Sequence, residues 1–166
     1  YSLSGWKGVA AGNVPIGAGL SSSAAFELAI ARAFTSVGNW EWQPLEMAGF
    51  CQRAENEWVG MNCGIMDQTI SALGQAGNAL FLDCRSLETL QVRMPDNLQI
   101  AVMDTGTRHE LVDSAYNERR LQCEKAAAFF EVKALRDLSL EKLRSSEKEL
   151  DPVVFRRARH VVTENQ

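Results

Sequence analysis

A glycine-rich segment followed by three serines contains the residue types that most clearly suggest chemistry. It reads Pro15-Ile-Gly-Ala-Gly-Leu-Ser-Ser-Ser-Ala-Ala25. Gly17 and Gly19 can adopt a positive φ and let a ligand approach the backbone closely. The serines open a helical pattern, and a helix start offers free N–H groups and the positive end of the helix dipole. The segment therefore predicts an anion site, in which serine hydroxyls add donors or a ligand for Mg²⁺.

A plain structural role also explains the same segment. An ordinary Gly-rich turn often precedes a helix whose N-cap is a serine. The segment is not a Walker A loop, because no Gly-Lys-Ser/Thr follows, and it lacks the third glycine of the G-x-G-x-x-G fingerprint. The pattern alone leaves both interpretations open.

Glu55 is the first of two acidic residues whose position suggests a role. Ala48, Cys51, Glu55 and Trp58 are spaced i, i+3, i+7 and i+10 in a helix predicted from Pro44 to about Val59, so Glu55 shares an apolar stripe. A carboxylate on a buried face needs a cation, a metal or hydrogen bonds. A structural arginine or a helix N-terminus would satisfy it as well as a metal would.

Asp67 is the second acidic residue. It follows Cys63-Gly-Ile-Met66 and precedes a short predicted helix. An N-cap is the commonest role for Asp at such a place. The alternative is functional, because an Asp at a loop-to-helix corner can accept a proton from a substrate hydroxyl.

Several other residues allow two interpretations. Tyr116 is either a core aromatic or a stacking surface for a sugar ring. The basic run Arg156–His160 is either a solvated helix face or a phosphate-binding patch. The tryptophans are expected to be packing residues, and these are Trp6, Trp40, Trp42 and Trp58.

Helical periodicity and turn residues predict the elements that position these groups. A helix over Ser21–Val37 carries apolar residues at i, i+4, i+7, i+8 and i+11, starting from Phe26, and ends at Gly38. Pro44 begins the second helix, as proline does at a first helical position. A loop, Gly60–Met66, then leads to a short helix over Asp67–Leu73.

The rest of the chain predicts strands and then helices. Short connections favour antiparallel pairing of three strands, at Ala79–Cys84, Gln91–Met94 and Leu98–Asp104. Three helices are predicted after Thr105, at Val112–Val132, Leu140–Glu149 and Pro152–Glu164. Asp151 is the expected N-cap of the last one.

Composition limits the classes of function. The 166 residues are 46% hydrophobic with a net charge of -4, which allows a packed core and argues against nucleic acid as a partner. No apolar stretch of about 18 residues occurs, so no membrane span or membrane partner is expected. The four cysteines form no C-x-x-C pair, which favours reduced, mostly buried thiols in a cytoplasmic protein.

Several motifs in order resemble one family. The segment Pro15–Ala25 is similar to the second signature of the superfamily that includes galactokinase, homoserine kinase and mevalonate kinase. The segment Cys63-Gly-Ile-Met-Asp-Gln68 resembles the catalytic segment of galactokinases. Asp83–Thr89 and Arg156–Glu164 are also similar to galactokinase stretches, so the resemblance covers nearly the whole chain.

The resemblance implies roles for individual residues. Asp67 would be the catalytic Asp beside the anomeric hydroxyl of the sugar. Ser23 and Glu55 would hold Mg²⁺ on the β- and γ-phosphates of ATP. Gly64, Asp67 and Tyr116 would contact the sugar. The nucleotide would be held by a run of residues in the glycine-rich segment: Pro15, Gly17, Ala18, Gly19, Leu20, Ser21, Ser22 and Ser23.

The resemblance also implies a fold and a domain organisation. The fold is α+β, of the two-domain type of this superfamily. Residues 1–106 would be the remainder of the N-terminal ATP- and sugar-binding domain, and residues 107–166 the start of an incomplete C-terminal domain, with a soft boundary near Gly106. The first residues precede an expected strand at Gly8–Ala11, and the last lie in a helical pattern without a stop residue, so both ends are expected to be cuts.

Two family motifs are absent from the chain. The N-terminal motif would supply a catalytic Arg and most sugar-binding groups, and the C-terminal Gly-rich motif would close over the nucleotide. Because loss of such an Arg can lower the rate by about 10³ or more, the chain alone is expected to be nearly inactive. Its expected partners are those missing segments, galactose and Mg-ATP.

The implied activity is ATP-dependent phosphorylation of galactose at its C1 hydroxyl. A non-catalytic galactose and ATP sensor on the same scaffold is one alternative. A kinase for a related sugar, such as N-acetylgalactosamine, is another, since the sugar-reading residues lie mostly in the absent N-terminal motif. The intact Ser21–Ala25 and Asp67 favour an enzyme over the sensor.

Overall fold

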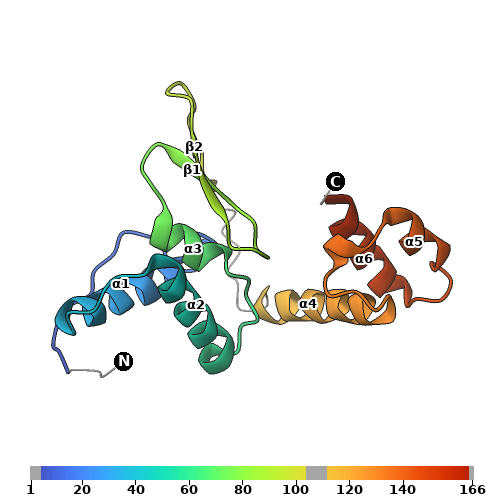
Figure 1. Cartoon of the computed structure of the whole chain (residues 1–166), viewed down its shortest axis with the longest axis horizontal. Coiled ribbons are helices and arrows are strands. Elements are labelled where there is room, and N and C mark those ends of the chain that lie inside the picture. Colours follow the sequence, from blue (N-terminus) through green and yellow to red (C-terminus); the bar gives the residue numbers. More distant parts are fainter. Residues whose placement is uncertain (1–4, 104–111, 165–166) are drawn as a thin grey trace. The chain divides into compact units, whose positions relative to one another are not determined.

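The computed structural model describes residues 5–103 and 112–164 (Figure 1). The chain divides into two compact units, Tyr1–His109 and Glu110–Gln166, and each is described here by itself. The boundary that the sequence predicts near Gly106 lies outside the described residues. The mixed α and β content agrees with the predicted α+β class.

The first unit contains three packed helices and a hairpin (Figure 1). Ser21 precedes α1, and proline stands at the start of α2, as the sequence predicts. A short π-helical turn, η1, continues α2 without a break. The bounds are α1 Ser22–Val37, α2 Pro44–Ala54, η1 Glu55–Val59, α3 Met66–Leu73, β1 Asn78–Leu82 and β2 Thr89–Arg93.

The two strands pair antiparallel, with register from Asn78↔Arg93 to Leu82↔Thr89, which confirms the first two predicted strands. The third is wrong, because residues 98–103 are not a strand, and Asp104 lies outside the described part. Gly8–Ala11 is not a strand either. Alternating apolar residues favour a strand, but a strand also needs a hydrogen-bonding neighbour, and neither segment has one among the described strands. Ile100 is accordingly 73% exposed.

Helix α1 has two apolar faces, and the sequence identified only one of them. The core contains the other face, where Leu28 packs with Met47 and Cys51 of α2. The predicted stripe is more exposed, since Phe26 is 57% and Val37 51% exposed. Part of that stripe lines a cavity instead of packing against α2 and α3.

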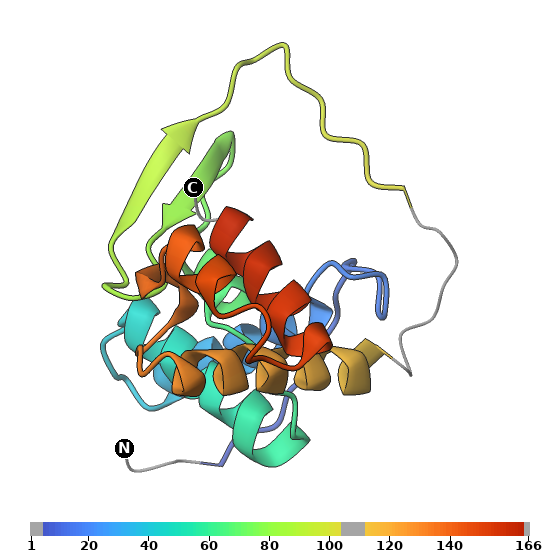
Figure 2. The same ribbon diagram turned by 90° about the vertical axis from the view of Figure 1, so that its right-hand side faces the viewer.

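The second unit is helical (Figure 2). It has its own hydrophobic core. Its elements are α4 Val112–Phe129, a 3₁₀ turn η3 Leu135–Asp137, α5 Leu140–Ser145 and α6 Pro152–Glu164. Leu143 of α5 is fully buried in this core, to which α6 contributes the most residues and α4 contributes Ala126. The predicted N-cap is confirmed, because Asp151 Oδ1 accepts hydrogen bonds from the backbone N–H groups of Val153 and Val154 at 2.9 and 3.1 Å.

Two helices in this unit are shorter than predicted. Helix α4 ends at Phe129, three residues early, because Glu131 adopts a left-handed conformation with φ 55° and the N–H of Val132 turns back to the carbonyl of Ala127. Glycine is the usual residue for such a cap, so a glutamate there gave no stop pattern. Helix α5 ends at Ser145 rather than Glu149.

Candidate active site

The glycine-rich segment alternates left-handed residues up to the start of α1. Gly17 has φ 73°, Gly19 φ 70° and Ser21 φ 56°. The positive φ values of the two glycines confirm what the sequence predicts. The positive φ of Ser21 is unexpected, because a serine in the left-handed conformation is strained. Residues in strained conformations are concentrated at binding sites. Backbone that alternates in this way turns successive N–H groups toward one side, where an anion can bind.

The N-terminus of α1 has no side-chain cap. Ser21 occupies the N-cap position, but its hydroxyl accepts no hydrogen bond from the helix N–H groups. The ordinary N-cap role that the sequence left open is therefore wrong. Ser23, in the first turn, is exposed. The first N–H groups of α1, at the positive end of its dipole, therefore receive no hydrogen-bond acceptor from the Ser21 side chain.

A cavity of about 640 Å³ lies beside this helix start. Its lining combines loop residues with residues of α1, and Ser22 is one of them. Trp6, one of the residues that line it, packs edge-to-face on Phe34 of α1 with ring centroids 5.8 Å apart. The uncapped N-terminus of α1, which could bind an anion, is therefore adjacent to a mainly apolar cavity.

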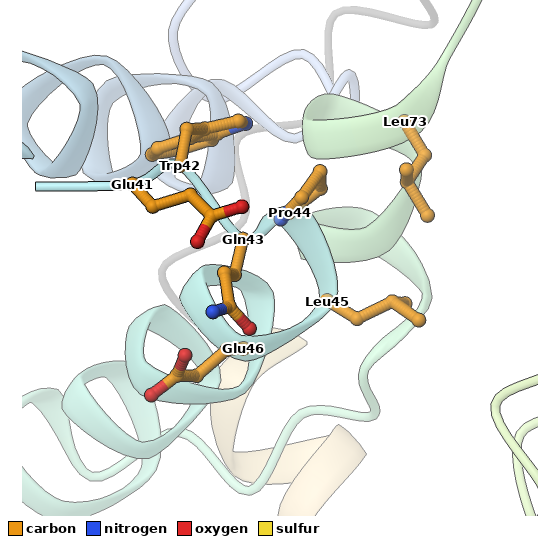
Figure 3. Close-up of a pocket in the computed structure, with 7 residues that line it drawn as sticks. All are labelled: Glu41, Trp42, Gln43, Pro44, Leu45, Glu46 and Leu73. Atoms are coloured by element: carbon orange, nitrogen blue, oxygen red, sulfur yellow. The ribbon is translucent and has the colours of Figure 1, made fainter.

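A second cavity, of about 480 Å³, lies at the start of α2 (Figure 3). Trp42 and Leu73 contribute apolar walls, and Glu41 and Glu46 contribute carboxylates. None of the site residues that the sequence predicts lines this cavity, so it is separate from the predicted site.

Glu55 is buried, with 6% of its surface exposed. Its Oε2 accepts a hydrogen bond of 2.7 Å from Nε2 of Gln68, and the thiol of Cys63 lies 3.7 Å from the same oxygen. Gln52 also holds this region, because its Nε2 donates to the carbonyl of Cys63 at 3.2 Å. The hydrogen-bond partner predicted for this carboxylate is therefore a neutral amide, and no described arginine is paired with it.

The predicted buried stripe of this helix is confirmed from Ala48 to Glu55 and is wrong after it. Ala48 and Cys51 are buried, but Trp58 is 89% exposed, so its expected packing role is wrong. The reason is the π-helical turn η1, in which the N–H of Gly60 bonds to the carbonyl of Glu55. The wider turn shifts the following residues out of the α-helical register.

Glu27 belongs to this cluster, and the sequence analysis missed it. Burial raises the pKa of Glu27, repulsion from Glu55 adds to the rise, and a hydrogen bond with Gln68 opposes it. Its Oε2 is buried without a hydrogen-bond partner, as is Oε1 of Gln68. The i, i+4 spacing of Ser23 and Glu27 places both on one face of α1 and could have identified it.

Asp67 lies in the first turn of α3 and is half-buried. It is not the N-cap, because the helix begins at Met66 and Ile65 holds that position. Gly64, in the loop before α3, is exposed, and a Cβ there would meet no atom within 4 Å. Asp67 and Gly64 therefore lie in the same loop-to-helix segment as Cys63 and Gln68.

Tyr116 lies on α4, in the second unit, and is 37% exposed. The core of that unit does not contain it, so a core role is not supported. Tyr116 and the pair Gly64 and Asp67 therefore belong to different units. The basic run of α6 is mostly solvent-exposed, as expected for a solvated face, and only Ala158 within it is buried.

The donors around Glu55 fit Mg²⁺ but do not complete a site. Mg²⁺ prefers oxygen ligands and is usually bound by one or two carboxylates together with phosphate oxygens and water. Glu55 supplies a buried carboxylate, and Ser23 supplies a hydroxyl on the face of α1 that carries Glu27. Among the described residues, no group of three or more His, Cys, Asp or Glu side chains could hold a metal.

All four cysteines are free, and their exposure differs. Cys84 is exposed, which corrects the expectation of mostly buried thiols for that residue. Burial, followed by repulsion from Glu27 and then Glu55, raises the pKa of Cys51 to about 11. Burial and then the charge of Glu55 likewise raise the pKa of Cys63 to about 11.

We expect iodoacetamide to modify Cys84 first at pH 8, with Cys51 and Cys63 at least about tenfold slower. The thiolate is the reactive form, and a raised pKa keeps these two thiols protonated until the pH approaches 11. Peptide mapping after timed alkylation at pH 7, 8 and 9 measures the rates. Equal modification of Cys84 and Cys51 in the folded chain would contradict the prediction, and urea-unfolded chain is the control.

In the described part of the chain, no helix has the length and apolar character required to cross a membrane. Residues 4–75 match the family described as GHMP kinases N terminal domain. The chain is also similar to a solved structure, that of Lactococcus lactis galactokinase complexed with galactose. The identity is 30%, the TM-score is 0.79, and the match covers 93% of this chain. It covers 41% of that galactokinase chain.

Proposed function

We propose that this chain is part of a GHMP-type kinase and carries part of a sugar kinase site that phosphorylates galactose at its C1 hydroxyl with ATP, supported by the family match over residues 4–75 and the similarity to a galactokinase structure. The observation that carries the proposal is the open N-terminus of α1. Gly17, Gly19 and Ser21 are left-handed there and no side chain caps the helix. Such an end suits a polyphosphate.

We assign the nucleotide phosphates to the glycine-rich segment, and Mg²⁺ to Ser23 and Glu55. Bound Mg²⁺ would offset the negative charge that gathers on the transferred phosphoryl group. Gly64 provides room beside Asp67, where the sugar hydroxyl would lie. Asp67 would orient that hydroxyl and accept its proton. Tyr116 of the second unit is the remaining sugar contact that the resemblance implies.

The test measures ADP release with Mg-ATP in the presence of galactose, N-acetylgalactosamine, glucose or no sugar. It is run on the 166-residue chain and on an extended form that adds the N-terminal and C-terminal motifs of the family. We expect galactose-dependent release from the extended form and little from the chain alone, with NMR placing the phosphate on C1.

Each other outcome has a definite meaning. Release that depends on N-acetylgalactosamine and not on galactose would change the substrate. If the extended form binds galactose and ATP without turnover, the protein is a sensor and not an enzyme. Turnover by the 166-residue chain at the rate of the extended form would disprove the need for the added motifs.

A Gly17→Val substitution is expected to weaken ATP binding at least about tenfold. Its φ of 73° is a conformation that β-branched residues rarely adopt. A Cβ at position 17 would meet no atom within 4 Å, so the effect would come from the backbone and not from a clash. Isothermal titration calorimetry with ATP and Mg²⁺ measures the change.

Gly12→Val is the matched control for this substitution. Gly12 lies in the same loop, also has open space around its Cβ, and has no positive φ. We expect a smaller loss of ATP affinity for this variant. Equal losses for the two variants would argue against a specific backbone conformation at Gly17.

A further inference from the structure

We propose that Gln68 is a positioning residue that holds the carboxylate of Glu55 in place for Mg²⁺, an inference that rests on the proposed function. Its amide Nε2 lies 2.7 Å from Oε2 of Glu55. Gln68 is 0% exposed and Glu55 only 6%, so water cannot substitute for this donor. The two residues are 13 positions apart in sequence and belong to α3 and η1.

The hydrogen bond joins the two halves of the proposed site. Gln68 directly follows Asp67 in α3, and Glu55 begins the π-helical turn after α2. The Nε2 atom also lies 3.8 Å from the thiol of Cys63, one residue before Gly64. A shift of α3 would therefore move the Glu55 carboxylate together with the residues assigned to the sugar.

Packing alone does not account for a glutamine here. Its Oε1 is buried without a partner, and so is Oε2 of the neighbouring Glu27. A buried unsatisfied oxygen lowers stability, and apolar residues often replace buried polar pairs without loss. The unpartnered Oε1 is thus a cost of having the amide here, and what the amide contributes in return is a fixed donor to the buried carboxylate of Glu55, together with a hydrogen bond to Glu27. Residues that orient a metal ligand in this way typically affect metal affinity by 10- to 100-fold.

Gln68→Met tests the inference, because methionine has a similar length and no donor. The readout is the Mg²⁺ concentration that gives half-maximal binding of the non-hydrolysable analogue AMP-PNP to the extended form. We expect that concentration to rise about tenfold or more. In the extended form, we expect the apparent KM for Mg²⁺ to rise while the KM for galactose changes little.

Gln52→Met is the matched control. It removes a glutamine amide that holds the same loop through the carbonyl of Cys63, whereas the hydrogen bond described for the Glu55 carboxylate comes from Gln68. We expect its Mg²⁺ requirement to change by less than about twofold. Equal shifts for the two variants would overturn the inference and leave the proposed function standing. Absence of Mg²⁺-dependent binding in the unmodified extended form would overturn both.

A second variant covers the case in which Gln68→Met does not fold, as judged by circular dichroism. Gln68→Asn keeps the amide but draws it back from Glu55 by one methylene group. We expect a raised Mg²⁺ requirement for this variant too. An unchanged requirement in folded Gln68→Asn would overturn the inference.

Discussion

An Asp67→Asn variant of the extended form is expected to release ADP about 10²- to 10⁴-fold more slowly than the unmodified enzyme, with galactose and Mg-ATP saturating. This range is the usual contribution of a positioned general base. Asparagine keeps the shape of the side chain but cannot accept the hydroxyl proton. Because Asp67 is half-buried in the first turn of α3 and does not cap that helix, the substitution should leave the fold intact.

Asp96→Asn is the control for this prediction. Asp96 is exposed, with 88% of its side chain accessible, and forms a surface ion pair with Arg93 at 3.0 Å. Surface pairs of this kind contribute little to stability, so this variant should retain full activity. Equal rates for the Asp67 variant and the unmodified enzyme would exclude Asp67 as the base and would return it to a structural role.

A Leu143→Ala substitution is expected to lower the free energy of unfolding of the second unit by about 2–5 kcal/mol. Leu143 is 0% exposed and lies in the cluster formed with Phe155, Val162 and their neighbours. The loss combines the transfer free energy of the removed atoms with the cavity that they leave. A small unit has little stability to spare, so the change should unfold much of it.

Segment-resolved hydrogen exchange on the whole chain measures this effect. Amides of α4 and α6 should exchange much faster in the variant than in the unmodified chain. Leu121→Ala is the matched control, because Leu121 is 53% exposed and the core does not contain it. Equal exchange in the two variants would mean that Leu143 does not carry the core of this unit.

Local sequence patterns predicted most helix positions. Proline at position 44 and Asp151 act through their own backbone neighbours, so their effect is visible within a few residues of sequence. The predicted strand at 98–104 failed for the opposite reason. Its alternation describes one strand, but the existence of a strand depends on a partner elsewhere in the chain.

The candidate site shows the same division between local and distant information. The left-handed Gly17 and Gly19 follow from glycine itself. The contact between Gln68 and Glu55, and the effect of Glu55 on the pKa of Glu27, join residues far apart in sequence. The motif that ends in Gln68 drew attention to Asp67, and no spacing rule connects Gln68 with Glu55. These contacts could be found only in the three-dimensional structure.

The π-helical turn makes the location of the site depend on a count of residues. With five residues in η1, Glu55 faces inward while Trp58 faces solvent. Deleting one residue of this turn would convert it to an ordinary α-helical turn and rotate everything after it by about 100°. Most surface loops accept insertions and deletions, but this turn should not. This holds even though Trp58 and Val59 are themselves exposed.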